Sequence, residues 1–374
     1  MEFVVASDEL RTKLEIARRF TGKSTMDITE SIKLYIPEKH DVLVIEASDY
    51  NKACRIRVKN VDIKSRGVVV VDGERLQRIV SSFGGVDLHF RTTGQLMIKS
   101  QSGELFKLVL LNPLEFPSIP GIPSSEKTFT IEAKDLVDIC EKLEFATDTS
   151  LARKGISKPF AELLYFRNQI VFATDAFKLA AIALPNFSAG EMDLPVATLP
   201  LLRLLDGEVH ITPEGTNTYL QSGDFFYFLR APDTMAPAAE QIIRSYNNPK
   251  VIYEFRSEEL NQLRINLKRL AIIDQNVSVI FKQNKILMGS FSSVGEHICE
   301  VNVLAKEFLE ESAAAYNASF LLGALKRTKT PTLASFGRRS PVKITEGNYV
   351  CLVQATTQHH IEKLERYDEQ GGAI

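Results

Sequence analysis

Hydrophobic and polar residues follow the same order in three successive stretches of the chain. Each stretch opens with a short run that is typical of a strand, at Phe3 to Ala6, Thr128 to Ile131 and Val251 to Phe255. Apolar residues at helical spacing follow, and the first of them are Leu10, Leu136 and Leu260. These leucines lie 126 and 124 residues apart, which predicts three copies of one strand-and-helix unit.

A turn glycine repeats with nearly the same period. Gly103, Gly223 and Gly347 each precede an apolar run, and they lie 120 and 124 residues apart. The first two stand in closely similar segments, Gln101-Ser102-Gly103-Glu104 and Gln221-Ser222-Gly223-Asp224. The pattern predicts a hairpin that enters a strand in every copy.

Each copy also predicts a second helix, over Gly73 to Phe83, Ala197 to Leu205 and Ala318 to Arg327. Two helices and roughly eight strands per copy indicate an α+β fold. Ser7 and Ser257 stand where a side chain can cap the helix that follows.

Linkers are predicted at the proline-rich stretch Pro113 to Pro123 and at Asn247-Asn248-Pro249. We therefore predict domains at residues 1–125, 126–247 and 248–357, followed by a polar tail at 358–374. Within the tail, Ile361, Leu364 and Tyr367 recur at helical spacing, so either a helix or a disordered segment is expected there.

Composition is that of an ordinary globular protein, with 44% hydrophobic residues, 25% charged residues and a net charge of −2. No apolar run approaches the roughly 18 to 20 residues of a membrane span. The four cysteines, Cys54, Cys140, Cys299 and Cys351, lack metal-ligand spacing, which favours reduced thiols in a cytoplasm.

Enzyme motifs are incomplete. Thr21-Gly22-Lys23-Ser24-Thr25 resembles the end of a P-loop, but Ala17 stands where the first glycine of that motif is needed. A nucleotide hydrolase using these residues would hydrolyse ATP as pure protein. Asp175 follows Thr174 at a strand end, where an aspartate more often fixes a turn than acts as an acid or base. We therefore predict no catalysis, no cofactor and no metal site.

Basic residues on and beside the predicted helices are more informative. They suit nonspecific contact with phosphates, although a solvated helix face has the same appearance. The helix from Lys134 to Glu144 is rich in acids and argues against a continuous basic stripe. The candidates for DNA contact are Arg11, Arg18, Arg19, Lys23, Arg78, Arg153, Lys154, Arg203, Arg264, Lys268, Arg269, Lys326 and Arg327.

One segment resembles a known family. Phe172-Ala173-Thr174-Asp175-Ala176-Phe177-Lys178-Leu179-Ala180 is similar to the Ala-Thr-Asp-Gly-His-Arg-Leu-Ala segment of the bacterial-type DNA sliding clamp, the β subunit of DNA polymerase III. Phe106-Lys107-Leu108, Leu114-Glu115-Phe116-Pro117 and Ala271-Ile272-Ile273 also resemble that family. The resemblance covers about residues 1 to 357.

The resemblance implies three tandem DNA-clamp domains, each with two helices and two antiparallel sheets, that form a ring as a head-to-tail homodimer. The helices would line the hole around double-stranded DNA, and the protein would be a cytoplasmic, nucleoid-associated processivity factor of replication. Phe106 and Leu108 would pack against Ile272 and Ile273 of the other protomer. The alternative is a clamp-fold protein that competes for clamp partners without encircling DNA.

The family also binds short peptides of DNA polymerase and of the ATP-dependent clamp loader in a pocket. The matching positions here are Thr174, Asp175, Lys178, Leu179, Pro237, Ile242, Leu352 and Val353.

That pocket departs from the family pattern. Ala176 and Phe177 replace the usual Gly-His, and Lys178 replaces the usual arginine as a point charge at the rim. The usual Met-Pro-Met-Arg-Leu ending becomes Leu352-Val353-Gln354-Ala355-Thr356, and the chain continues beyond it. We expect the tail either to lie near the pocket and compete with partners or to be an appendage. Such drift fits a clamp of a phage, of a plasmid or of a distant bacterial lineage.

Overall fold

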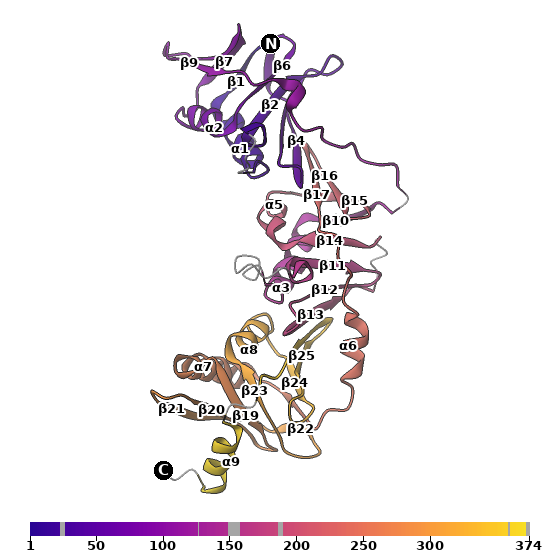
Figure 1. The fold of residues 1–374 in the computed structure, drawn as a ribbon, viewed down its shortest axis with the longest axis vertical. Helices are drawn as coiled ribbons and strands as arrows, with labels where there is room; N and C mark the ends of the chain where they lie inside the picture. Colours follow the sequence, from indigo (N-terminus) through magenta and orange to yellow (C-terminus); the bar gives the residue numbers. More distant parts are fainter. Residues whose placement is uncertain (23–26, 126, 149–157, 186–189, 358–359, 372–374) are drawn as a thin grey trace. The chain divides into compact units, whose positions relative to one another are not determined.

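A computed structural model describes residues 1–22, 27–125, 127–148, 158–185, 190–357 and 360–371 (Figure 1). Contacts group the chain into two compact units, and each unit takes its residues from two parts of the sequence. Unit 1 contains residues 1–138 and 188–233, and unit 2 contains residues 139–187 and 234–374. The two units therefore differ from the three predicted domains. The difference arises because strands of neighbouring predicted domains pair with one another in shared sheets.

Unit 1 holds two antiparallel sheets. Alternating burial of apolar side chains, as in β1 with Phe3 and Val5 buried, places one face of each strand in the core. The first sheet has the order β5-β1-β7-β8-β9, with β1 (Glu2–Ala6), β5 (Val61–Ser65), β7 (Asp87–Thr92), β8 (Gln95–Ser100) and β9 (Leu105–Val109). The second has the order β10-β15-β16-β17-β4-β3-β2-β6, with β2 (Ser31–Ile36), β3 (Leu43–Ser48), β4 (Lys52–Val58), β6 (Gly67–Asp72), β10 (Phe129–Glu132), β15 (Glu208–Glu214), β16 (Asn217–Ser222) and β17 (Phe225–Arg230).

The second sheet runs across a predicted domain boundary. β17 pairs with β4, so that Phe225 lies opposite Ile56 and Leu229 opposite Lys52. The predicted linker also packs on this sheet, because Phe116 and Ile119 are buried against Ala53 and neighbouring apolar residues. The first two predicted domains are therefore joined by strand pairing as well as by the chain.

The helices of unit 1 follow the predicted apolar spacing. α1 (Ser7–Arg18) packs beside α2 (Gly73–Ser81), and Leu10 and Leu14 are fully buried. A short helix α5 (Leu199–Leu202) precedes β15, and β14 (Met192–Pro195) precedes α5. The helix α3 (Ala133–Glu144) begins in unit 1 and ends in unit 2.

Unit 2 repeats the same arrangement. Its large sheet has neighbouring strands in the order β11-β12-β13-β26-β25-β24-β18-β22, with β11 (Leu163–Arg167), β12 (Ile170–Thr174), β13 (Lys178–Ala183), β18 (Val251–Glu254), β22 (Ala305–Phe308), β24 (Thr332–Ser335), β25 (Val342–Glu346) and β26 (Tyr349–Val353). The pairing of β13 with β26 joins the second and third predicted domains, as β17 and β4 join the first two. The strand pairs in both units are antiparallel, which confirms the predicted fold class.

A second sheet of unit 2 carries helices on both faces. Its order is β21-β20-β19-β23, with β19 (Asn276–Phe281), β20 (Lys285–Phe291), β21 (Glu296–Asn302) and β23 (Ser312–Asn317). Figure 1 shows this sheet between α7 (Ser257–Ile273), which packs beside α8 (Ala318–Leu325), and α9 (Ile361–Glu369) in the tail. A short helix α6 (Ala239–Ser245), which the sequence pattern did not predict, precedes β18.

Both landmarks of the sequence repeat, the leucines and the turn glycines, are confirmed in all three copies. Leu10, Leu136 and Leu260 are all buried. Gly103, Gly223 and Gly347 have positive φ angles of 93°, 53° and 57°, which a glycine adopts without the strain that a Cβ brings. Each of these glycines turns the chain into a paired strand, as the repeat predicted.

The predicted caps are corrected. Ala6 and Arg256, rather than Ser7 and Ser257, precede the two helices. The Ser7 hydroxyl is buried and accepts a hydrogen bond from the Val86 N–H at 3.2 Å, so it joins α1 to the residue that precedes β7. At α7, the Glu259 carboxylate accepts from the Arg256 N–H at 2.8 Å and supplies the cap that Ser257 does not.

No helix in the described ranges is both long and apolar enough to cross a membrane.

Candidate functional site

The turn between β12 and β13 is built around one buried carboxylate. Asp175 is 2% exposed, and its Oδ1 accepts from the N–H groups of Phe177 at 2.9 Å and Lys178 at 2.8 Å. A buried carboxylate needs such donors, because its desolvation is otherwise costly. Asp175 therefore holds the turn, as the sequence pattern indicated.

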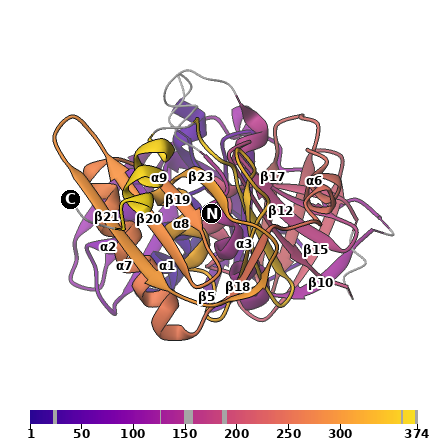
Figure 2. The ribbon, with the colours of Figure 1, turned by 90° about the horizontal axis from the view of Figure 1, so that it is seen from below.

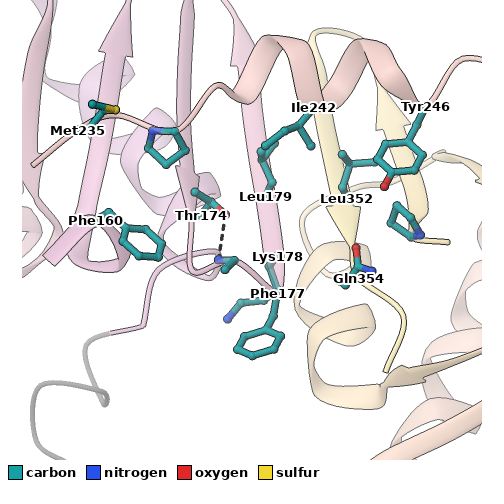
Figure 3. Close-up of a pocket in the computed structure, with 13 residues that line it drawn as sticks. Phe160, Thr174, Phe177, Lys178, Leu179, Met235, Ile242, Tyr246, Leu352 and Gln354 are labelled. Atoms are coloured by element: carbon teal, nitrogen blue, oxygen red, sulfur yellow. Dashed lines mark hydrogen bonds between the residues drawn. The ribbon is translucent and has the colours of Figure 1, made fainter. Parts of the chain in front are cut away.

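Ala176 occupies the strained position of this turn. Its φ is +77°, in the left-handed region that costs a residue with a Cβ about 1–2 kcal/mol. The Thr174 Oγ1 accepts from the Ala176 N–H at 3.1 Å, drawn as a dashed line in Figure 3. Ala176 thus adopts a left-handed conformation at the position where the family pattern has glycine.

Lys178 is an ion-paired residue. Its Nζ lies 2.8 Å from Asp175 Oδ2 and 4.4 Å from the centre of the Phe320 ring, and the residue is only 8% exposed. The sequence interpretation placed a point charge at the rim here. Instead, the charge of Lys178 is compensated within the protein and is not free for a ligand.

A cavity of about 390 Å³ opens beside this turn (Figure 3). Six of the eight predicted pocket residues line it, namely Thr174, Lys178, Leu179, Pro237, Ile242 and Leu352. Asp175 and Val353 do not line it. Asp175 is turned into the protein to hold the turn, and Val353 is fully buried because alternate side chains of β26 point to opposite faces.

Seven lining residues were not predicted, namely Phe160, Ala176, Phe177, Met235, Tyr246, Pro341 and Gln354. Two of them are prominently exposed, Phe177 at 53% and Met235 at 90%. Adjacent sequence signals existed for Ala176, Phe177 and Gln354, which stand inside or beside the family motifs. The pocket therefore combines an apolar floor with an aromatic and thioether mouth, which suits the apolar anchors of a short peptide.

In unit 1, the candidate DNA contacts are partly neutralised by acids. Arg11 pairs with Asp8 at 3.0 Å, and Arg78 pairs with Glu74. Arg18 lies 3.5 Å from Glu74, and its guanidinium also donates to Thr21 Oγ1 and to the Glu30 carbonyl. Arg19 and Arg203 are exposed, and Arg19 donates to the Pro200 carbonyl at 3.2 Å.

In unit 2, the candidates divide into two kinds. Lys268, Arg269 and Lys326 are exposed, and none of them forms a salt bridge with a residue that the structure describes. Arg264 donates to the carbonyls of Leu325 and Thr328 and so ties α7 to the end of α8.

Arg327 belongs with Arg264 as a structural tie. It donates to the carbonyls of Gly323 at 2.8 Å and Glu141 at 3.4 Å, and it lies 4.5 Å from the centre of the Phe145 ring. Desolvation lowers the pKa of Arg327, as expected for a half-buried guanidinium. Lys23, Arg153 and Lys154, the other predicted contacts, lie outside the described residues.

The predicted interface residues differ in exposure. On β9, an edge strand, Phe106 is 36% exposed and packs edge-to-face on Phe83, whereas Leu108 is 7% exposed. Ile272 at the end of α7 is 81% exposed, and Ile273 is half-buried. Leu105 and Val109 on the other face of β9 are also exposed. Leu108 is therefore largely covered by its own unit, and the free apolar surface of β9 includes residues that were not predicted.

The described part of the chain contains no cluster of histidine, cysteine, aspartate or glutamate that could hold a metal ion. Burial raises the pKa of the Cys140 and Cys351 thiols to about 12, which keeps them protonated.

Comparisons with known proteins extend the fold description. A family model described as DNA polymerase III beta subunit, N-terminal domain, matches residues 1–120. The beta sliding clamp of Helicobacter pylori strain J99 is 20% identical over 342 residues, which are 88% of this chain and 89% of that protein.

Solved structures match over more of the chain. DNA polymerase III subunit beta from Pseudomonas aeruginosa has a TM-score of 0.85 at 19% identity, covering 96% of this chain and 100% of that one. The H. pylori beta clamp bound to a DNA ligase peptide has a TM-score of 0.81 at 20% identity, with the same coverage.

The fold is therefore that of the sliding clamps. Within this class, the predicted resemblance to the bacterial-type clamp, the β subunit of DNA polymerase III, is confirmed and extends over nearly the whole chain.

Proposed function

We infer that this chain is a non-enzymatic DNA sliding clamp, a processivity factor that encircles duplex DNA and tethers the replicative polymerase. The observation that carries this proposal is the agreement in fold with bacterial clamps over 96% of the chain. The strand pairing that continues from one predicted domain to the next supports three tandem clamp domains at 1–125, 126–247 and 248–357.

The ring is a head-to-tail homodimer in this proposal. Exposed Phe106 on the edge strand β9 and exposed Ile272 at the end of α7 offer apolar surfaces of the kind that a closed interface buries. Ile273 contributes as a half-buried neighbour, whereas Leu108 is already largely covered within its own unit.

DNA is held by weak, nonspecific contact with phosphates. Lys268, Arg269 and Lys326 carry most of this role, because they are exposed and have no acidic partner among the described residues. Arg11, Arg18, Arg19, Arg78 and Arg203 contribute less, since their guanidinium groups are shared with acids or carbonyls or belong to other contacts. A protein that works on DNA in this way is cytoplasmic and associated with the nucleoid.

The pocket beside Ala176 binds short apolar peptides of the polymerase and of the clamp loader. Its volume and its apolar lining support this role, and one relative of the same fold is known in a complex with a DNA ligase peptide.

Encirclement is tested by topology. Protein loaded onto a nicked circle with a clamp loader and ATP is expected to stay on the DNA through gel filtration and to leave after the circle is cut once. The matched control is the Ile272→Ala/Ile273→Ala variant, which is expected to be lost from circular DNA as well. Equal retention on circular and linear DNA would overturn the proposal. A protein that binds clamp partners without any retention on circles would be the interaction protein considered above.

A further inference from the structure

The C-terminal helix is docked as part of unit 2. Ile361 and Leu364 are buried in one cluster with Ile280, Leu287 and Ala315 of the four-stranded sheet. Gly289 makes this close packing possible, because a Cβ added there would lie 2.9 Å from Leu364 Cδ1. Figure 2 shows α9 lying over this sheet, and the pocket is lined by none of its residues. Residues 360–371, the described part of the tail, therefore do not line the pocket, which argues against competition with partners.

Contacts lead from α9 to one side of the pocket by two routes. The first runs through β23, where the Thr356 N–H donates to the Ala315 carbonyl at 2.8 Å and Ala355 bridges to Tyr316. Two residues earlier, Gln354 lines the pocket, and its N–H donates to the Phe177 carbonyl at 2.9 Å. β23 therefore contacts both the apolar cluster under α9 and the segment that carries Gln354 to the pocket.

The second route runs through the loop before β25. Arg338 in this loop forms a salt bridge with Glu365 of α9, and the Ser340 carbonyl accepts from the Tyr316 hydroxyl at 3.2 Å. Pro341, the next residue, lines the pocket, and Phe336 of the same loop packs edge-to-face on Tyr246, which also lines it. Figure 3 shows Tyr246 and Gln354 on the same side of the pocket.

We propose that α9 positions the wall of the pocket formed by Tyr246, Pro341 and Gln354, so that the docked helix strengthens the binding of a partner peptide. The inference rests on the proposed peptide-binding function of this pocket. Its physical basis is preorganisation, because a wall that is already ordered costs less entropy when the peptide binds. The effect of the tail is thus opposite in sign to competition, under which removal of the tail would tighten binding.

The test compares single variants of the full chain. Leu364→Asp places a charge in the apolar cluster and undocks α9, whereas Leu364→Met preserves the packing. Glu369→Ala is the matched control, because Glu369 is exposed on the same helix. Binding of a labelled Gln-Leu-Ser-Leu-Phe peptide is measured by fluorescence anisotropy. We expect Leu364→Asp to weaken it roughly five-fold or more, as is typical of coupled sites, and both other variants to bind as the unchanged protein does.

A second measurement separates positioning from general destabilisation. Coupling is reciprocal, so peptide bound to the unchanged protein should slow hydrogen exchange of the α9 amides. Leu364→Asp should also speed exchange of the Gln354 amide in the absence of peptide, while the core amides of β19 keep their protection. Unchanged or tighter peptide binding by Leu364→Asp would overturn the inference. If no form binds the peptide, the proposed function of the pocket fails, and an unchanged Gln354 amide in Leu364→Asp then overturns the inference separately.

Discussion

The helix pair α1–α2 of unit 1 and the helix pair α7–α8 of unit 2 bury apolar residues at the same spacing but differ in how their basic residues are paired with acids. In both pairs the first helix follows a short strand and buries its leading leucine, Leu10 or Leu260. On α1 and α2, the acids Asp8 and Glu74 lie beside three of the cations, namely Arg11, Arg18 and Arg78. On α7 and α8, the exposed cations have no such partners among the described residues.

The difference separates two demands on a repeated fold. Buried positions keep their spacing because each copy must cover the same sheet with the same stripe of apolar side chains. Exposed positions are free to change, and there the copies acquire different electrostatic roles. A basic residue in the sequence therefore becomes a candidate for DNA contact only when it is both exposed and free of acidic neighbours.

The largest expected effect tests whether the buried leucines of the two helix pairs are equivalent in packing. Leu10→Ala and Leu260→Ala each remove a buried side chain, so each should lower the free energy of unfolding of its unit by about 2–5 kcal/mol. Denaturant unfolding followed by circular dichroism measures the loss, and Thr12→Ala is the control at a solvent-facing position of α1. A nearly neutral result at either leucine would show that the two helix pairs are not equivalent in packing.

The next prediction addresses the charge difference. For binding to a short duplex, the logarithm of the association constant falls linearly with the logarithm of the salt concentration. Lys268→Ala/Arg269→Ala should make this slope shallower by roughly 0.9 for each phosphate contact that is lost. Arg11→Ala/Arg78→Ala should change it less, because these guanidinium groups are already paired with Asp8 and Glu74. Titrations at several salt concentrations give both slopes. Equal slopes for the two variants would mean that acidic neighbours do not decide which helix pair holds DNA.

The smallest expected effect concerns Glu346, an acid whose carboxylate is held mainly by backbone N–H groups near α8. Glu346 Oε1 accepts from the N–H groups of Lys329 at 2.8 Å and Thr330 at 2.5 Å, just beyond α8. Burial by itself would raise the pKa of Glu346, but the N–H groups of Thr330 and Lys329 outweigh it and hold the pKa below its ordinary value of 4.5. The ionised Glu346 carboxylate therefore stabilises the fold fully above pH 4.5, and this contribution is lost as the pH falls through the lowered pKa.

Glu346→Gln should accordingly lower the melting temperature at neutral pH, and the gap between the two proteins should close in acid. Thermal unfolding at a series of pH values measures that gap. A constant difference across the series would indicate a packing effect of the substitution rather than the loss of an ionised group.

Elements whose residues act locally could be predicted from sequence alone. The turn glycines, the buried leucines and the role of Asp175 follow from neighbours within a few positions. The pocket residues inside the family motifs, such as Leu179 and Leu352, were found for the same reason.

Residues that meet only in the tertiary structure could not be predicted. Phe160, Tyr246 and Pro341 reach the pocket from three separate segments without any shared pattern. Arg264 and Arg269 stand on the same helix and cannot be told apart from the sequence. Only the structure shows that Arg264 donates to the carbonyls at and beyond the end of α8, whereas Arg269 is exposed. The helical spacing of the tail was visible, but its docking site depends on the small residue Gly289, which in sequence is an ordinary strand position.

The internal pairing of Lys178 with Asp175 has a consequence for handling the protein. Ionic strength screens exposed charges strongly and buried pairs far less. Under the proposed function, contacts of Lys268 and Arg269 with DNA are expected to weaken as salt is added, whereas the pocket, whose lining lysine Lys178 is already ion-paired, is expected to keep its affinity for an apolar peptide. A wash at high salt should then remove nucleic acid from a preparation that still binds its peptide partners.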